Sequence, residues 1–228
     1  MKFEYERDKI LVLLLITDAI FVLFHILNVY TDLLSSSLYS LKRDQGYGEF
    51  FQYTKELWIA VLFLILGFKK KKGVYFAFAM LVFFFLFDDY FSLHEQLGIF
   101  IAQMLNFQPA LGLRGIDFGE LLFSAVIGIL FLVLFILFSL ISDRQTRLMI
   151  LYMLIFIVLL AGFGVLLDMT EVIIKNSAVS RVVAIFEEGG EMFVMSWILW
   201  FVMRINLYDD ELPLNWLPIK KKEHALSD

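Results

Sequence analysis

The sequence predicts an all-α membrane protein, a polytopic bundle of transmembrane helices. Of its 228 residues, 61% are hydrophobic and 17% are aromatic, and the mean hydropathy is +0.80. Ordinary soluble domains are about 45–50% apolar, so this excess points to lipid as the surrounding solvent. Several stretches also approach the roughly 20 apolar residues that a helix needs to cross a bilayer.

We expect six spans in one transmembrane domain that covers residues 1–228. The apolar run from Ile10 to Val29 is longer than the core of a typical signal peptide and has no clear small-residue cleavage site, which favours a retained first span. The loop around Pro109 cannot continue as helix through the proline, so 97–105 is expected to be an interfacial turn of helix. The expected spans are 9–30, 54–68, 74–96, 117–142, 147–170 and 181–203, followed by a cytoplasmic tail at 204–228. For the second span a start near 49 is the alternative, and Tyr53 and Trp58 suit a start at the membrane interface.

Positively charged loops predict the orientation. Lys69–Lys72 connect the second and third spans, and Arg144 and Arg147 lie between the fourth and fifth. With six spans, these segments fall on the same side as both termini, and cytoplasmic loops are enriched in lysine and arginine. We therefore expect an N-in, C-in protein of the cell (plasma or inner) membrane.

Composition also limits the partners. Lys220, Lys221 and Lys222 follow Trp216 in the tail, which suits contact with an anionic inner leaflet, although a solvated tail explains them equally well. The formal charge of −5, without a basic face or motif, argues against nucleic acid. The chain has no cysteine, which excludes disulfides and thiolate metal sites. The oligomeric state stays open, and the bilayer is the one expected partner.

The last expected span contains an unusual group of acids. Glu187, Glu188 and Glu191 lie in the stretch FEEGGEMF, which is otherwise apolar or small. One acid near the centre of a membrane helix costs about 2.5–3.5 kcal/mol, so three of them must face something other than lipid. On an ideal helix they share a sector of about 100°, and Gly189 and Gly190 lie opposite, where a neighbouring helix could approach closely.

Other spans bring polar groups to the same depth. Because successive spans alternate in direction, the outer half of the bundle is expected to hold a carboxylate-lined pocket. The residues concerned are His25, Asp88, Asp89, His94, Glu95, Glu120, Asp168 and Glu171, and Asp18 is expected nearer the middle of the bilayer. So many acids cannot all be ionised close together.

Few basic groups are expected at this depth. Besides His25 and His94, the candidates are Arg114, Lys175 and Arg181 at the rim, and no span is expected to carry a mid-membrane lysine of the kind that a retinal Schiff base needs. The imbalance favours a bound metal, shared protons or a water-filled cavity.

Three segments carry a family resemblance. They are DDYFSLHE at 88–95, the acid Asp168 late in the Gly-containing stretch GFGVLLDMTE, and EEGGEM at 187–192. Together they resemble a loose group of uncharacterised bacterial multi-pass membrane proteins with D-[DE]-x4-H-E and E-E-x2-E-M segments, over roughly residues 85–204. The resemblance implies a membrane bundle of six or seven helices and implies no activity.

A metal centre is the first functional hypothesis. Carboxylates with imidazole suit Fe, Mn or Zn, and carboxylates alone suit Mg, Ca or Mn. A spare acid beside a metal-bound water could serve as general base toward a lipid or an externally presented substrate. The first-choice ligands are Asp88, His94, Glu95, Glu188 and Glu191, and the second-choice ligands are Glu120, Asp168 and Glu187.

Two further hypotheses stay open at this stage, and whether the protein is an enzyme stays undecided. Intramembrane acids often mark ion paths, which favours a cation or proton transporter or channel, although few polar groups are expected in the inner halves of the spans. Acids that hydrogen-bond among helices would instead indicate a scaffold or sensor. A haem between His25 and His94 is a minor alternative.

Overall fold

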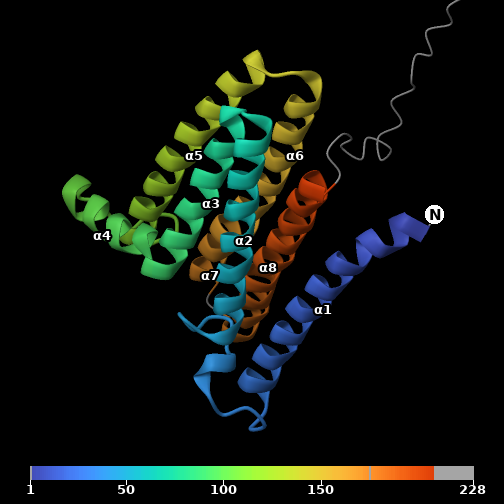
Figure 1. Ribbon diagram of the computed structural model, residues 1–228. Coiled ribbons are helices and arrows are strands. Elements are labelled where there is room, and N and C mark those ends of the chain that lie inside the picture. Colours follow the sequence, from blue (N-terminus) through green and yellow to red (C-terminus); the bar gives the residue numbers. More distant parts are fainter. Residues whose placement is uncertain (1, 175, 208–228) are drawn as a thin grey trace, which may run out of the picture.

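The structure, a computed structural model, describes residues 2–174 and 176–207 and is built of helices (Figure 1). No strand occurs in that part of the chain, where the one β-type pairing is an isolated bridge between Ala110 and Leu113. The elements are α1 (Lys2–Tyr30), a 3-10 turn (Ser37–Tyr39), α2 (Tyr47–Lys70), α3 (Gly73–Phe91), α4 (Leu93–Leu105), α5 (Gly115–Ile141), α6 (Arg144–Ala161), a π-helical segment (Gly162–Leu167), α7 (Asp168–Ile173) and α8 (Ser177–Leu207). The all-α prediction is confirmed.

Five helical segments of the described chain are long and apolar enough to cross a membrane. They are Lys9–Tyr30, Tyr47–Lys70, Gly73–Phe91, Gly115–Ile141 and Arg144–Ile173. The sixth expected span, 181–203, lies within the 31 residues of α8, which carry three glutamates and two arginines and are not among these five. The chain thus has the helices of a membrane protein, while a sixth crossing and the N-in, C-in orientation stay predictions.

The long helices alternate in direction (Figure 1). In that view α1, α3 and α6 run toward the bottom, and α2, α5 and α8 run toward the top. The loop 31–46, the connection through α4 and the start of α8 therefore lie at one end, which we call the Lys42 end. At the opposite end, the Lys72 end, Lys72 pairs with Asp143 and joins the α2–α3 turn to the α5–α6 turn. The C-terminal residues 208–228, with Lys220 to Lys222, lie outside the described part.

An apolar core fills the half of the bundle toward the Lys72 end. Phe63 of α2 stacks on Phe78 of α3 with ring centroids 5.2 Å apart, and Phe78 stacks on Phe135 of α5 at 4.1 Å. Ile198 and Leu199 of α8 are almost fully buried in the same cluster. Membrane helices associate largely through such close packing, so this half holds the bundle together and contains few polar side chains.

Two of the expected spans are interrupted. For the span 74–96 the sequence left two alternatives, because Asp89 and His94 do not share the face of Asp88 and Glu95 on an ideal helix: unwinding near Ser92, or separate contacts for those two residues. Ser92 adopts a left-handed conformation (φ 48°, ψ 48°), ends α3 and precedes α4. The expected span 74–96 is therefore wrong beyond residue 91, and the expected helical turn at 97–105 belongs to a 13-residue helix. Between α6 and α7, Gly162–Leu167 forms a π-helical turn inside the expected span 147–170, and such turns are frequent at functional sites.

The second expected span, 54–68, begins too late. α2 starts at Tyr47, so Lys55 and Glu56 lie about two turns inside the helix instead of at its end. The aromatic residues that suggested an interfacial start do not terminate the helix: Tyr53 is buried, and Trp58 is half exposed. This difference decides where the polar site is found.

Candidate functional site

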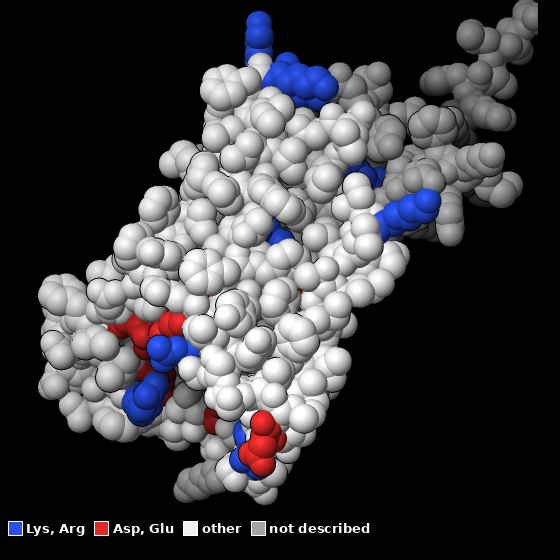
Figure 2. Space-filling model, turned by 60° about the horizontal axis from the view of Figure 1, so that its bottom comes forward, with Lys and Arg blue, Asp and Glu red and all other residues white. Residues whose placement is uncertain are grey.

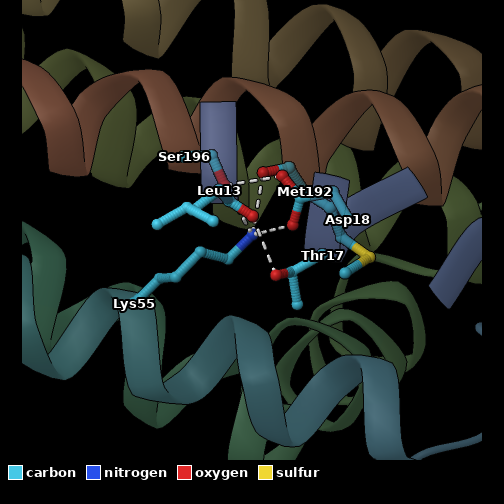
Figure 3. A network of polar contacts seen from close by, with 6 residues as sticks. All are labelled: Leu13, Thr17, Asp18, Lys55, Met192 and Ser196. Atoms are coloured by element: carbon cyan, nitrogen blue, oxygen red, sulfur yellow. Dashed lines mark hydrogen bonds and ion pairs between the residues drawn. The ribbon is translucent and has the colours of Figure 1, made fainter. Parts of the chain in front are cut away.

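A fully buried ion pair joins three helices. Lys55 of α2 donates from Nζ to Oδ1 of Asp18 in α1 at 3.0 Å and to the main-chain oxygen of Met192 in α8 at 2.8 Å (Figure 3). Ser196 of α8 donates from Oγ to the other Asp18 oxygen, Oδ2, at 2.6 Å. Lys55, Asp18 and Ser196 each have an exposed fraction of 0%. Charges so far from water are tolerated only when they are paired and hydrogen-bonded.

This ion pair overturns two expectations from the sequence. Lys55 is a lysine inside the bundle, where none was expected, and it adds a basic partner to the few that were expected. Its ammonium also lies 4.8 Å from the centre of the Phe51 ring. The cause of the error is the late start assigned to the second span, which put Lys55 at the membrane interface.

The next residue of α2, Glu56, places a carboxyl group beside Asp89 of α3. Only 1% of Glu56 is exposed, and neither of its carboxyl oxygens accepts a hydrogen bond from an ordinary donor among the described residues. Its near neighbour is the Asp89 carboxyl, and two carboxyl groups can hydrogen-bond only if one of them holds a proton. One turn earlier on the same face of α2, the side-chain oxygen of Gln52 is also buried without a partner.

The three glutamates of α8 face the same region. Glu188, Glu191 and Asp89 lie close enough for their charges to act on one another. The carboxyl group of Glu191 lies against the π-helical segment, because a Cβ atom added to Gly164 would be 1.9 Å from its Oε1. The missing side chain at Gly164 thus makes room for an acid from the facing helix.

The two glycines of FEEGGEMF allow close packing, as expected. A Cβ atom added to Gly190 would lie 2.2 Å from Cδ1 of Phe163 in the π-helical segment, and one at Gly189 would lie 3.2 Å from Val22 of α1. Neighbours therefore approach α8 from both sides at this level.

A salt bridge covers the group at the Lys42 end. Lys42, in the loop before α2, donates to both carboxyl oxygens of Glu171 at 2.6 Å, and Ser180 of α8 donates to the same carboxyl group at 3.0 Å. The Glu171 carboxyl also contacts that of Glu187. Asp168, Glu187 and Glu188 are only half-buried, so water can reach the acids from this end. In Figure 2, acidic side chains appear at the end that is brought forward, while the flank of the bundle is almost uncharged.

A second polar group lies at the junction of α3, α4 and α5. Asp88 accepts the main-chain N–H of His94 at 2.7 Å and lies 3.2 Å from its Nδ1, so it caps the start of α4. The hydrogen bond between the imidazole ring and the Asp88 carboxylate raises the pKa of His94 to about 9. Glu120 of α5 packs over Gly98 of α4, and Glu95 is exposed. Asp88 and His94 thereby hold the break after Ser92 in place.

Arg114 and Asp117 fix the start of α5 in the same group. The Arg114 main chain and guanidinium donate to the fully buried Asp117 carboxyl at 2.6–2.9 Å. These hydrogen bonds raise the pKa of Arg114. Arg114 was expected as a basic rim residue for the acids, and the structure gives it Asp117 as its partner.

His25 serves the loop after α1. Its Nδ1 accepts the main-chain N–H of Leu41 at 3.0 Å and lies 3.3 Å from Ser40 Oγ. Asn28, one turn on, donates to the main-chain oxygens of Leu34 and Ser36. Both side chains thereby shape the loop that carries Lys42 over the acids.

The predicted layer of acids is present, but it is divided between these two groups. Glu56, Asp89 and the α8 glutamates form what we call the carboxyl layer, and Asp88, His94 and Glu120 belong to the α3–α4–α5 junction. Among the described residues, no three His, Cys, Asp or Glu side chains are arranged to hold a metal ion. The metal hypothesis and its two ligand sets stay predictions.

The buried polar atoms without partners share one property. Among the described residues they are Gln52 Oε1, both carboxyl oxygens of Glu56 and Glu187 Oε2. All four are acceptors of hydrogen bonds when the carboxyl groups are ionised. The interior is therefore short of donors and of positive charge, in spite of Lys55.

Comparison with known proteins gives a family and no activity. No curated protein matches the chain, and no solved structure matches it. A family described as a domain of unknown function, DUF8692, matches residues 10–207, which include most of α1, all of α2 to α8 and both polar groups. The chain belongs to this family.

Proposed function

We propose that the protein carries cations across a cell membrane by way of the carboxyl layer, with the proton as the first candidate. The supporting observation is the shortage of donors around Glu56, whose two carboxyl oxygens are buried without a partner. Leaving a buried polar group unpaired costs about 1–3 kcal/mol, and more for a charged group. A bound proton or cation removes that cost.

Protons suit this arrangement better than a tightly held metal ion. Glu56 and Asp89 come from adjacent helices and bring two carboxyl groups together, so they can share one proton. A structural metal site would need three or more ligands that converge on one point, and the described residues do not provide such a group.

The two helix interruptions support transport over a purely structural role. The break at Ser92 follows Asp88 and Asp89, and the π-helical segment contains Gly164, which faces Glu191. In many transporters the coupling ion binds where membrane helices are discontinuous. Both interruptions therefore occur where the proposal requires an ion to bind.

The apolar core indicates a carrier instead of an open pore. The stacked rings of Phe63, Phe78 and Phe135 fill the bundle between the carboxyl layer and the Lys72 end. Ions could enter from the Lys42 end in this conformation, and passage to the other end would need a movement of helices. We therefore expect slow flux without channel-like conductance.

Proton flux in proteoliposomes tests the proposal. Purified protein is reconstituted around a pH-sensitive dye, a potassium gradient with valinomycin sets the membrane potential, and the initial rate of internal pH change is measured. Flux above that of empty vesicles is expected for the wild type and for Glu95→Gln, whose side chain is exposed. Glu56→Gln should reduce the flux at least tenfold.

Two outcomes would contradict the proposal. Equal flux from the wild type, Glu56→Gln and empty vesicles would exclude proton transport, and the same vesicles loaded with sodium or calcium indicators extend the test to other cations. Stoichiometric metal in the purified protein, lost in Glu188→Gln, would instead support the metal centre predicted from the sequence.

A further inference from the structure

Lys55 and Glu56 are neighbours in the chain, and their side chains meet different helices. Lys55 reaches Asp18 on α1, and Glu56 reaches Asp89 on α3. The ammonium of Lys55 acts electrostatically on both Asp18 and Glu56. One fixed cation thus lies between two carboxyl sites, and it is hydrogen-bonded to only one of them.

We propose that Lys55 is a tethered cation that exchanges between Asp18 and the Glu56–Asp89 pair, and so competes with the cation that the carboxyl layer binds. This inference rests on the proposed function. In the structure Lys55 is paired with Asp18, so the Glu56–Asp89 pair is available to bind the exchangeable cation. When Asp18 is neutralised, the ammonium pairs with the Glu56–Asp89 site and the proton held there leaves for the water at the Lys42 end.

The surroundings of Lys55 make such an exchange chemically balanced. Two carboxyl groups lie near the ammonium, those of Asp18 in α1 and Glu56 in α2. The charge of Glu56 is in turn influenced by Asp89 of α3 and Glu191 of α8. The remaining partners are neutral: the Met192 carbonyl and the Ser196 hydroxyl. The net charge of the interior is conserved, because the proton that neutralises Asp18 replaces the one that leaves the Glu56–Asp89 pair, while the ammonium stays inside the bundle.

The exchange would also couple ion binding to the position of α1. α1 packs mainly on α8, and the bond between Asp18 and Lys55 is a charged tie from α1 to α2. If Lys55 leaves Asp18, that tie is broken. A cation bound at Glu56 and a docked α1 would thus favour one another.

Counting protonated carboxyl groups tests the inference. Infrared spectroscopy of purified protein at pH 7 gives the intensity of the carboxylic C=O band, which shifts in D₂O when the group exchanges. In Asp18→Asn the band is expected to lose the equivalent of one group, because Lys55 displaces the proton of the Glu56–Asp89 pair. In Lys55→Met it should gain one group, since Asp18 is left unpaired, and in the double variant the wild-type intensity should return.

Ser196→Ala serves as a milder variant in case Asp18→Asn does not fold. It removes one hydrogen bond from Asp18 and keeps the charge, so a smaller loss of the same band is expected. An unchanged or stronger band in Asp18→Asn, or in Ser196→Ala if only that variant folds, would overturn the exchange. A wild type without any protonated carboxyl group would instead refute the proton as the cation of the proposed function, so the two failures are distinguishable.

Discussion

The buried ion pair gives the most quantitative prediction. Lys55→Met removes the ammonium and keeps most of the side-chain volume, so the main change is an unpaired Asp18 carboxyl in a site with no exposure. Asp18 would keep its bond from Ser196 and lose its counter-charge. The variant is expected to be substantially less stable than the wild type.

The magnitude follows from the geometry. At the observed Nζ–Oδ1 distance of 3.0 Å, and with an effective dielectric constant of about 20, the gross attraction is about 5–6 kcal/mol. Desolvation of both ions offsets much of it in the intact pair, but the removal of one partner from a buried pair typically costs about 3–5 kcal/mol. We expect a loss in this range at pH 8 and a smaller loss at pH 5, because Asp18 takes up a proton more easily there.

The free energy of unfolding in mixed detergent micelles measures the effect. Lys55→Met is compared with the double variant Asp18→Leu/Lys55→Met, in which no charge remains and stability should recover to within about 1 kcal/mol of the wild type. A loss below about 1 kcal/mol in the single variant, together with no recovery in the double variant, would refute the view that the pair is buried and mutually dependent.

Two further predictions concern the neighbouring elements. Because the pKa of His94 is raised to about 9 from its usual 6.5, the bond to Asp88 stabilises the fold fully below about pH 6.5 and loses its effect as the pH rises through 9. The partial exposure of His94 limits this to about 1 kcal/mol, and thermal unfolding at pH 6 and pH 9.5 should show a difference in the wild type that Asp88→Asn abolishes. Gly190→Ala should lower the free energy of unfolding by about 1–3 kcal/mol, because its Cβ would lie 2.2 Å from the Phe163 ring. Gly128→Ala has nothing within 4 Å of the added Cβ, so it should be neutral or stabilising by up to about 1 kcal/mol. Equal effects of the two substitutions would contradict the close packing behind α8.

Hydropathy was sufficient to predict the helical bundle and the positions of its long segments. Hydropathy alone could not place the break at Ser92, because a single residue in a left-handed conformation leaves no mark on an apolar pattern. The facing of Asp89 and His94 on an ideal helix did leave unwinding near Ser92 as one of two alternatives. The π-helical turn at 162–167 was equally invisible, although its Gly164 makes room for Glu191 of α8, and Gly190 of α8 makes room for its Phe163.

Some acids of the candidate site were named from the sequence, but Lys55 and Glu56 at its centre were not. The acids of α8 and Asp89 were found because they interrupt apolar runs. Lys55 and Glu56 precede the apolar core of their span, so they were assigned to the interface. The spacing of Gln52 and Glu56 could have indicated a shared polar face, since residues four apart lie on one face of a helix. To predict that this face is buried, one must also know that α2 starts at Tyr47.

The most direct test of the donor shortage in the carboxyl layer is the infrared band of protonated carboxyl groups in the wild type and in Glu56→Gln at pH 7. A band that is present in the wild type and weaker in Glu56→Gln is the expected result, because Glu56 and Asp89 share a proton. A spectrum in which all carboxyl groups of the wild type are ionised, or a band that Glu56→Gln leaves unchanged, would contradict it.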